Sequence, residues 1–82
     1  MQGFYYVYRL RSVSHPAEVY TGVTENLDER VRKHNSGSVP HTAKYRPWFL
    51  DMAIAFRSRD KAAAFESYLK SGSGREFARR HF

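Results

Sequence analysis

Five side chains of this sequence have the types and the spacing that chemistry on a phosphate requires. Tyr8 and Tyr20 supply phenols, Arg30 supplies a planar fork of donors, and His34 can move protons near neutral pH. Glu66 supplies a carboxylate, which suits Mg²⁺ because that ion keeps most of its waters and takes other oxygens from a phosphate. Together these groups are the parts needed to cut a phosphodiester bond.

The tyrosines belong to two predicted strands. Residues 4–10 and 19–24 are rich in aromatic and β-branched residues, and the turn-like segment between them predicts an antiparallel hairpin. Because residues two apart share one face of a strand, Tyr6 and Tyr8 project together and Tyr20 can lie across from them. Ordinary core packing is the alternative for each tyrosine.

A glycine interrupts the second predicted strand two residues after Tyr20. Glycine inside a strand marks either a bulge or the close approach of another group. The sequence leaves both explanations open for Gly22.

The first predicted helix, over residues 25–37, carries the arginine and the histidine. Leu27 and Val31 are four residues apart and should face the core. Arg30 and His34 form a second pair on the shoulder of that apolar stripe, from which they can reach the tyrosine face. A solvated basic surface is the alternative for this pair.

The glutamate lies on a second predicted helix, over residues 58–72. Its apolar stripe consists of Ala62, Phe65 and Leu69. Glu66 borders this stripe, so its carboxylate should have a partner. The partner is either Lys70, in an ion pair one helical turn away, or a metal ion.

These elements predict an α+β fold of one domain over residues 1–82. A third strand over 48–56 and a short basic helix or frayed tail over 74–82 complete the order β-β-α-β-α-α. Three strands cannot close a barrel, so we expect a mainly antiparallel sheet flanked by helices. Asp51, the one charge of the third strand, should face outward or lie near an edge.

The charge of the chain favours an anionic partner. The 82 residues carry a formal charge of +6, which together with the aromatic content favours nucleic acid. No cysteine is present, which excludes disulfides and cysteine–zinc sites, and no membrane span or secretory signal is visible. We therefore expect a cytoplasmic protein that does not bind membranes.

Two basic segments are candidates for gripping a nucleic acid. The polar loop over residues 36–47 contains Lys44, Tyr45 and Arg46, and the C-terminal segment contains Arg75 and Arg79. The cations would neutralise phosphates, and Tyr45 or Trp48 could stack on an unpaired base. Burial in the core is the favoured alternative for Trp48.

The ordered set of residues resembles the GIY-YIG nuclease family. Its two motifs would correspond to Tyr6-Val7-Tyr8 and to Tyr20-Thr21-Gly22, followed by the helical arginine, the histidine and the metal-binding glutamate. The likeness extends from about residue 4 to about residue 77. It is greatest toward the small, single-domain bacterial members that are called predicted endonucleases.

The resemblance implies a divalent-metal-dependent endonuclease that uses Mg²⁺ or Mn²⁺. It implies that Tyr8 is the general base, that Arg30 binds the scissile phosphate, that His34 assists proton transfer and that Glu66 holds the metal. The phenol needs positive charge nearby, which Arg30 and the metal would supply. Tyr6 and Gly22 would support the site as members of the motifs.

The expected substrate is DNA in preference to RNA, cut with low or structure-based specificity. Larger members attach a separate DNA-binding domain, for which 82 residues leave no room, so a protein partner for targeting is a further hypothesis. Many members also carry an asparagine after the glutamate, and none follows Glu66 here. The alternative function is therefore a basic nucleic-acid-binding module with the same fold and little or no catalytic activity.

Overall fold

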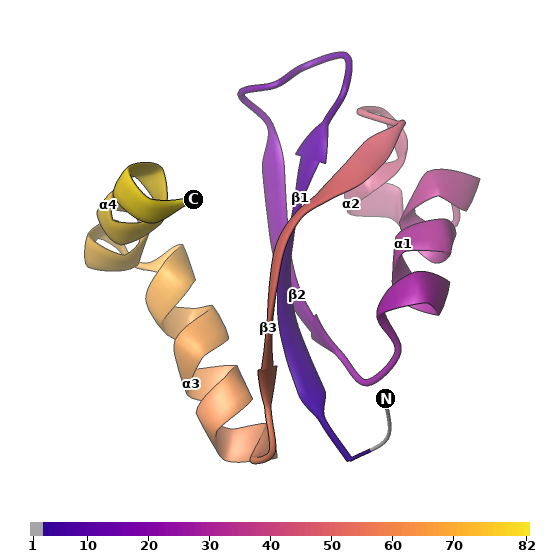
Figure 1. Ribbon diagram of the computed structural model, residues 1–82. Helices are drawn as coiled ribbons and strands as arrows, with labels where there is room; N and C mark the ends of the chain where they lie inside the picture. Colours follow the sequence, from indigo (N-terminus) through magenta and orange to yellow (C-terminus); the bar gives the residue numbers. More distant parts are fainter. Residues whose placement is uncertain (1–2) are drawn as a thin grey trace.

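A three-stranded antiparallel sheet forms the middle layer of the molecule (Figure 1). The computed structural model describes residues 3–82. The strands are β1 (Tyr5–Ser12), β2 (Val19–Thr24) and β3 (Trp48–Phe56), in the spatial order β2-β1-β3. Strand β1 pairs with both neighbours and is therefore central. The predicted hairpin and the α+β class are confirmed.

The helices cover the sheet from both sides. Figure 1 shows α1 (Leu27–Ser36) and α2 (Pro40–Ala43) on one side, and α3 (Arg59–Lys70) and α4 (Gly72–His81) on the other. The predicted element order is confirmed, with α2 as an addition. This short helix lies inside the segment expected to be a polar loop, and that expectation was wrong because one turn of helix has no apolar periodicity to reveal it.

Capping residues define the ends of the helices. Asn26 and Ser58 are the N-caps of α1 and α3, and each accepts a hydrogen bond from a backbone N–H of the first turn. Gly37 ends α1 in the left-handed conformation with φ 86°. Gly72 was expected to end α3, but it is the first residue of α4. Ser71 ends α3 and caps the N-terminus of α4, so one residue separates the two helices.

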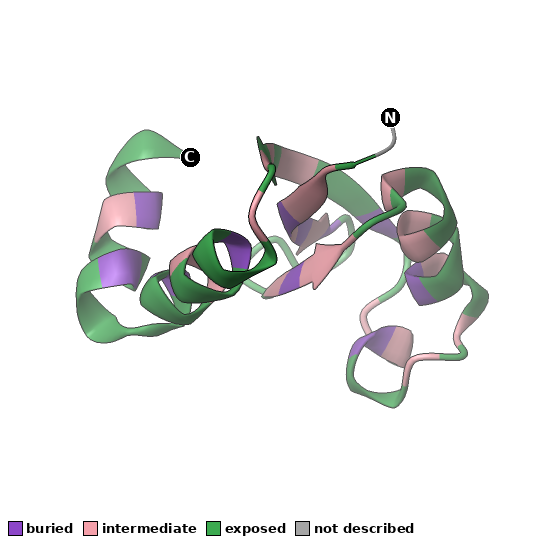
Figure 2. Ribbon diagram, turned by 90° about the horizontal axis from the view of Figure 1, so that it is seen from below, coloured by how far each residue is buried: buried purple, intermediate pink, exposed green. Residues whose placement is uncertain are grey.

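Each face of the sheet has its own apolar cluster, because successive residues of β1 point to opposite faces. On the α3 side, Val7 packs with Ala62, Leu69 and Ala78, and on the α1 side Tyr8 packs with Leu10 and Trp48. Figure 2 shows the buried residues on the inner sides of the helices. The predicted stripe of α3 and the predicted burial of Trp48 are confirmed, as is the contact of Leu27 and Val31 with the core.

Asp51 lies on the edge strand β3 but does not face outward. Its side chain is only 19% exposed, and its Oδ2 accepts a hydrogen bond from Arg11 at 3.4 Å. Arg9 Nε lies 3.8 Å from the same oxygen. Of the two expected positions, the one near an edge is confirmed. The side chain does not face outward, because two arginines of β1 lie on the same face and attract the carboxylate.

The contact between α3 and α4 generates a prediction on stability. A Cβ atom added at Gly74 would lie 1.7 Å from the carbonyl oxygen of Tyr68, a backbone atom that cannot move aside cheaply. We expect Gly74→Ala to lower the free energy of unfolding by about 1–3 kcal/mol, measured by urea denaturation. Gly72→Ala is the matched control, since no described atom lies within 4 Å of its added Cβ. Equal midpoints for the two variants would contradict this packing.

Candidate active site

The hydroxyl of Tyr8 is the centre of a buried hydrogen-bond network. Tyr8 Oη lies 2.9 Å from His34 Nε2, and Arg30 Nε donates a hydrogen bond to the same oxygen at 3.2 Å. The side chains of Tyr8 and His34 are both 0% exposed. The network therefore joins the central strand to helix α1 beneath the surface.

The second ring nitrogen of His34 is held by a residue that the sequence analysis missed. His34 Nδ1 lies 2.9 Å from Thr42 Oγ1, and the Thr42 hydroxyl donates a longer bond of 3.4 Å to the carbonyl of Val39. With that orientation Thr42 accepts from Nδ1–H, which leaves Nε2 free to accept from the Tyr8 hydroxyl. The signal that could have revealed Thr42 is Pro40, which is favoured in the first turn of a helix.

Burial shifts the proton affinities of this network. It raises the pKa of the Tyr8 phenol, and the hydrogen bond from Arg30 opposes only part of that rise. Burial and the positive charge of Arg30 lower the pKa of His34 below its ordinary value. The hydrogen bond to Tyr8 raises the pKa of Arg30. Tyr8 and His34 are therefore neutral at pH 7. Arg30 favours the Tyr8 phenolate as expected, but burial outweighs its effect on the pKa in the free protein.

Tyr20 lies against the network as predicted. Its ring centroid is 4.7 Å from that of His34 and 6.2 Å from that of Tyr8, and its side chain is half-buried. Arg30 also interacts with Tyr20. The structure thus brings together four of the five predicted catalytic residues: Tyr8, Tyr20, Arg30 and His34. Tyr20 and Arg30 are its half-exposed members.

Gly22 makes room for the ring of Tyr8. The two residues are cross-strand partners, and a Cβ at position 22 would lie 2.7 Å from Tyr8 Oη and 3.1 Å from the ring of Tyr20. The pairing of β1 with β2 continues past Gly22 without a register shift. Of the two explanations left open by the sequence, the structure supports close approach and excludes a bulge.

Glu66 lies apart from the four clustered residues. Its Oε2 accepts a hydrogen bond from Lys70 Nζ at 3.1 Å, which is the ion pair that the sequence offered as the alternative to a metal. The carboxylate is nevertheless near enough for its charge to contribute to the raised pKa of Tyr8. Among residues 3–82, no group of three or more His, Cys, Asp or Glu side chains is arranged to hold a metal ion.

The predicted nucleic-acid-binding residues lie on both sides of the sheet. Lys44 and Arg46 adjoin α2, whereas Arg75 and Arg79 lie on α4 (Figure 1). Tyr45 is half-buried against Trp48, which leaves less of its ring free for stacking on a base than the sequence suggested. In the described part of the chain, no helix is long and apolar enough to span a bilayer.

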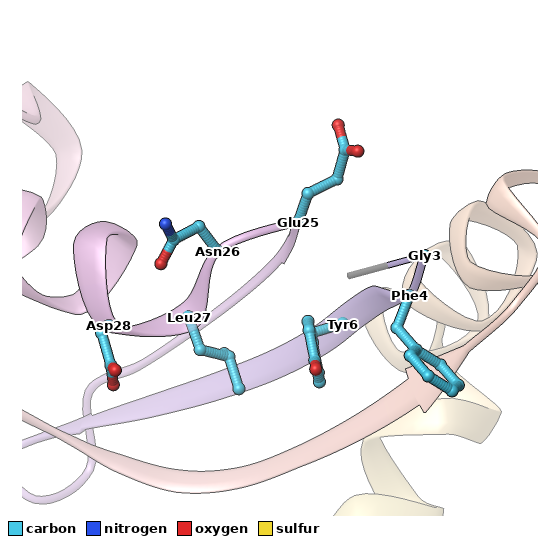
Figure 3. Close-up of a pocket in the computed structure, with 7 residues that line it drawn as sticks. All are labelled: Gly3, Phe4, Tyr6, Glu25, Asn26, Leu27 and Asp28. Atoms are coloured by element: carbon cyan, nitrogen blue, oxygen red, sulfur yellow. The ribbon is translucent and has the colours of Figure 1, made fainter. Parts of the chain in front are cut away.

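A cavity of about 530 Å³ has none of the four network residues in its lining. Tyr6 and Leu27 line it together with the acidic residues Glu25 and Asp28 (Figure 3). Two carboxylates disfavour a phosphate at this place. A smaller cavity of about 180 Å³ is lined by the cations Arg30 and Lys33 and by one carboxylate, Glu29, so it is the better match for an anion beside the network.

The lowered pKa of His34 predicts how stability depends on pH. Because the unfolded histidine gains a proton at higher pH than the folded one, the free energy of unfolding should fall as pH drops below about 6.5. It should level off once the pH is below the folded pKa. His34→Gln should make this dependence shallower, and His41→Gln, at an exposed histidine, should not. Urea denaturation between pH 7.5 and 5 measures the pH dependence of the free energy of unfolding. The same dependence in wild type and His34→Gln would contradict the prediction.

Comparison with known proteins agrees with this geometry. The model of the GIY-YIG catalytic domain matches residues 4–80. The structure-specific endonuclease subunit SLX1 of Debaryomyces hansenii is 39% identical over 74 residues, which cover 82% of this chain and 21% of that protein. SLX1 of Yarrowia lipolytica is 36% identical over 74 residues, 82% of this chain and 26% of that protein. The chain therefore spans about a quarter or less of the length of these relatives.

A solved structure shares the fold. The solution NMR structure of the UPF0213 protein BH0048 from Bacillus halodurans matches with a TM-score of 0.56 at 32% identity, over 93% of this chain and 80% of that one. The expected enzyme class, a phosphodiester hydrolase, agrees with the endonuclease relatives. The motifs, the network of Tyr8, Tyr20, Arg30 and His34, and the match over residues 4–80 lead to one conclusion: the chain belongs to the GIY-YIG catalytic domain family.

Proposed function

We propose that this chain is an endonuclease that hydrolyses phosphodiester bonds of DNA, with low or structure-based specificity. The observation that carries the proposal is the buried bond between Tyr8 and His34, completed by Arg30, in a member of a family of catalytic domains. Burying the polar side chains of Tyr8 and His34 in a domain of 82 residues is costly, and apolar residues would fill the same space more cheaply. The SLX1 relatives, which are structure-specific endonuclease subunits, support the substrate class.

Arg30 is the group that would bind the scissile phosphate. Its Nε donates to Tyr8, so the remaining guanidinium donors are available on the half-exposed side. Arg30 and Lys33 line one cavity, in which a phosphate would lie near both cations and beside the network. Arg30 would also stabilise the charge that develops on the phosphate oxygens in the transition state.

Tyr8 and His34 would move the proton of the attacking water. Tyr8 Oη would accept that proton while its own proton passes over 2.9 Å to His34 Nε2. Since burial disfavours a free phenolate, this coupled transfer avoids one. The lowered pKa keeps Nε2 free to accept at neutral pH, and Thr42 holds the other ring nitrogen. Because Tyr8 is fully buried, the half-buried ring of Tyr20 would have to move to admit water.

The donors present fit a metal held by one carboxylate and not a multi-ligand cage. Glu66 is one-quarter exposed and already attracts a cation, the ammonium of Lys70 at 3.1 Å. Glu66 would hold Mg²⁺ or Mn²⁺ in place of that ammonium. When bound, the ion would polarise the phosphate and stabilise the leaving oxygen.

Loss of the arginine should slow cleavage strongly. We expect Arg30→Ala to lower kcat/KM on nicked plasmid or branched oligonucleotide substrates by about 10²–10³, the usual effect of removing one charge-stabilising donor. Arg32→Ala removes an exposed cation from the same helix, outside the cavity that Arg30 lines, and should change the rate only a few-fold. Circular dichroism confirms that both variants are folded. Equal rates for wild type and Arg30→Ala, or no cleavage by wild type, would overturn the catalytic role.

Cleavage should also require the glutamate and a divalent ion. Chelation with EDTA should abolish cleavage, and added Mg²⁺ or Mn²⁺ should restore it in wild type but not in Glu66→Gln. Glu76→Gln, an equal loss of charge at an exposed residue, is the control and should retain activity. Cleavage that persists in EDTA would contradict the role of the metal.

A nucleic-acid-binding module with little activity is the second candidate function. The ion pair of Glu66 with Lys70 and the formal charge of +6 favour it. It predicts salt-sensitive binding that persists in EDTA and gives no cleavage products. A partner protein that targets the domain is a separate hypothesis, and co-purification from native extract would detect it.

A further inference from the structure

A second cationic cavity lies between strand β2 and helices α3 and α4, on the side of the sheet opposite α1. Its volume is about 420 Å³. Three cations line it, one each from β1, α3 and α4: Arg9, Lys70 and Arg75. Of the three, only Arg75 was predicted from the sequence as a nucleic-acid-binding residue. None of the three belongs to the network around Tyr8.

Arg9 is the unusual member of this cavity. Its side chain is 12% exposed, and its Nε and Nη1 are buried without a hydrogen-bond partner among the described residues. Asp51 Oδ2 lies 3.8 Å from Nε, too far for a hydrogen bond, and the same oxygen already accepts from Arg11. Burial lowers the pKa of Arg9, which records the cost of removing the guanidinium from water. A buried guanidinium with free donors requires an acceptor.

Few negative charges oppose an anion in the cavity. Its lining contains no acidic side chain, and the nearby carboxylates are already engaged, Asp51 by Arg11 and Glu66 by Lys70. Arg75 is exposed and makes no ion pair among residues 3–82, unlike Arg79 and Arg80 on the same helix, which both bind Glu76. The cavity therefore has the unpaired charge of Arg75 at its rim. At its base lies Arg9, whose only carboxylate partner among the described residues, Asp51, is shared with Arg11.

Tyr20 connects this cavity to the candidate active site. The residue lines the cavity with its neighbour Thr21, and its ring also contacts His34 and Tyr8. A strand of nucleic acid that crosses the edge of β2 would thus meet both places in succession. Apolar residues on the remaining wall, Val19, Leu69 and Ala78, suit the face of a sugar beside its phosphate.

We propose that the cavity lined by Arg9, Lys70 and Arg75 binds a phosphate of the nucleic-acid strand next to the phosphate held at Arg30. This inference rests on the proposed function for the identity of the strand, but the binding of phosphate itself does not require cleavage. The fork of Arg9 would supply donors at the base of the cavity, and Lys70 and Arg75 would neutralise the charge from the rim.

The first measurement uses inorganic phosphate and no nucleic acid. Added sodium phosphate should raise the Tm of wild type above its value in sodium chloride of equal ionic strength, because an anion that binds only the folded state stabilises it. In ¹⁵N–¹H spectra the largest shifts should fall on Thr21, Leu69 and Ala78. Arg75→Gln should lose the increment in Tm, whereas Arg80→Gln, an equal loss of charge on the same helix, should keep it. Equal increments in both variants, or shifts centred elsewhere, would overturn the proposal.

The second measurement uses a single-stranded oligonucleotide in EDTA, where no cleavage is expected. The slope of log Kd against log salt should fall by about 1 in Arg75→Gln and remain unchanged in Arg80→Gln. Arg9→Lys retains the charge but loses the fork, so it should weaken phosphate binding while remaining folded by circular dichroism. Failure of cleavage with these results intact would reject the endonuclease and not the cavity. Intact cleavage with no difference between Arg75→Gln and Arg80→Gln would reject the cavity alone.

Discussion

The buried hydrogen bond between Tyr8 and His34 is the constraint on which the α1 side of the molecule depends. It fixes helix α1 against the central strand, and the other nitrogen of His34 fixes Thr42 and with it helix α2. Trp48 Nε1 then donates to the Thr42 carbonyl at 2.8 Å, which extends the connection to β3. Breaking one member would leave a buried polar group unpaired, at a cost of about 1–3 kcal/mol. Stability and the candidate chemistry therefore use the same bonds.

Periodicity predicted this side of the site well. The two-residue repeat of strands placed Tyr8 and Tyr20 on one face, and the helical repeat placed Arg30 and His34 beside the stripe of Leu27 and Val31. Both predictions depend only on local geometry, which a sequence determines directly. The direction in which each residue points was therefore available before any contact was known.

Burial depth and choice of partner were not available in this way. Nothing local indicates that Tyr8 is fully buried, because that depends on how closely α1 packs on the sheet. Glu66 had two possible partners, and the sequence could not choose between them. Thr42 lies in a single turn of helix with no apolar repeat, and Arg9 shares the face of Val7 although its charge is typical of an exposed residue. Each of these features is set by tertiary packing.

The fit of Gly22 to Tyr8 also has a consequence for how the hairpin forms. A slip of one residue between β1 and β2 would place Thr21 or Val23 against the Tyr8 ring and move Tyr20 to the other face. The ring would then collide with a side chain where it now lies over a bare backbone. Only the observed register leaves room for the Tyr8 ring, so this contact selects the alignment of the hairpin. Gly22, which makes room for Tyr8 in the candidate site, thus also disfavours a hairpin paired in the wrong register.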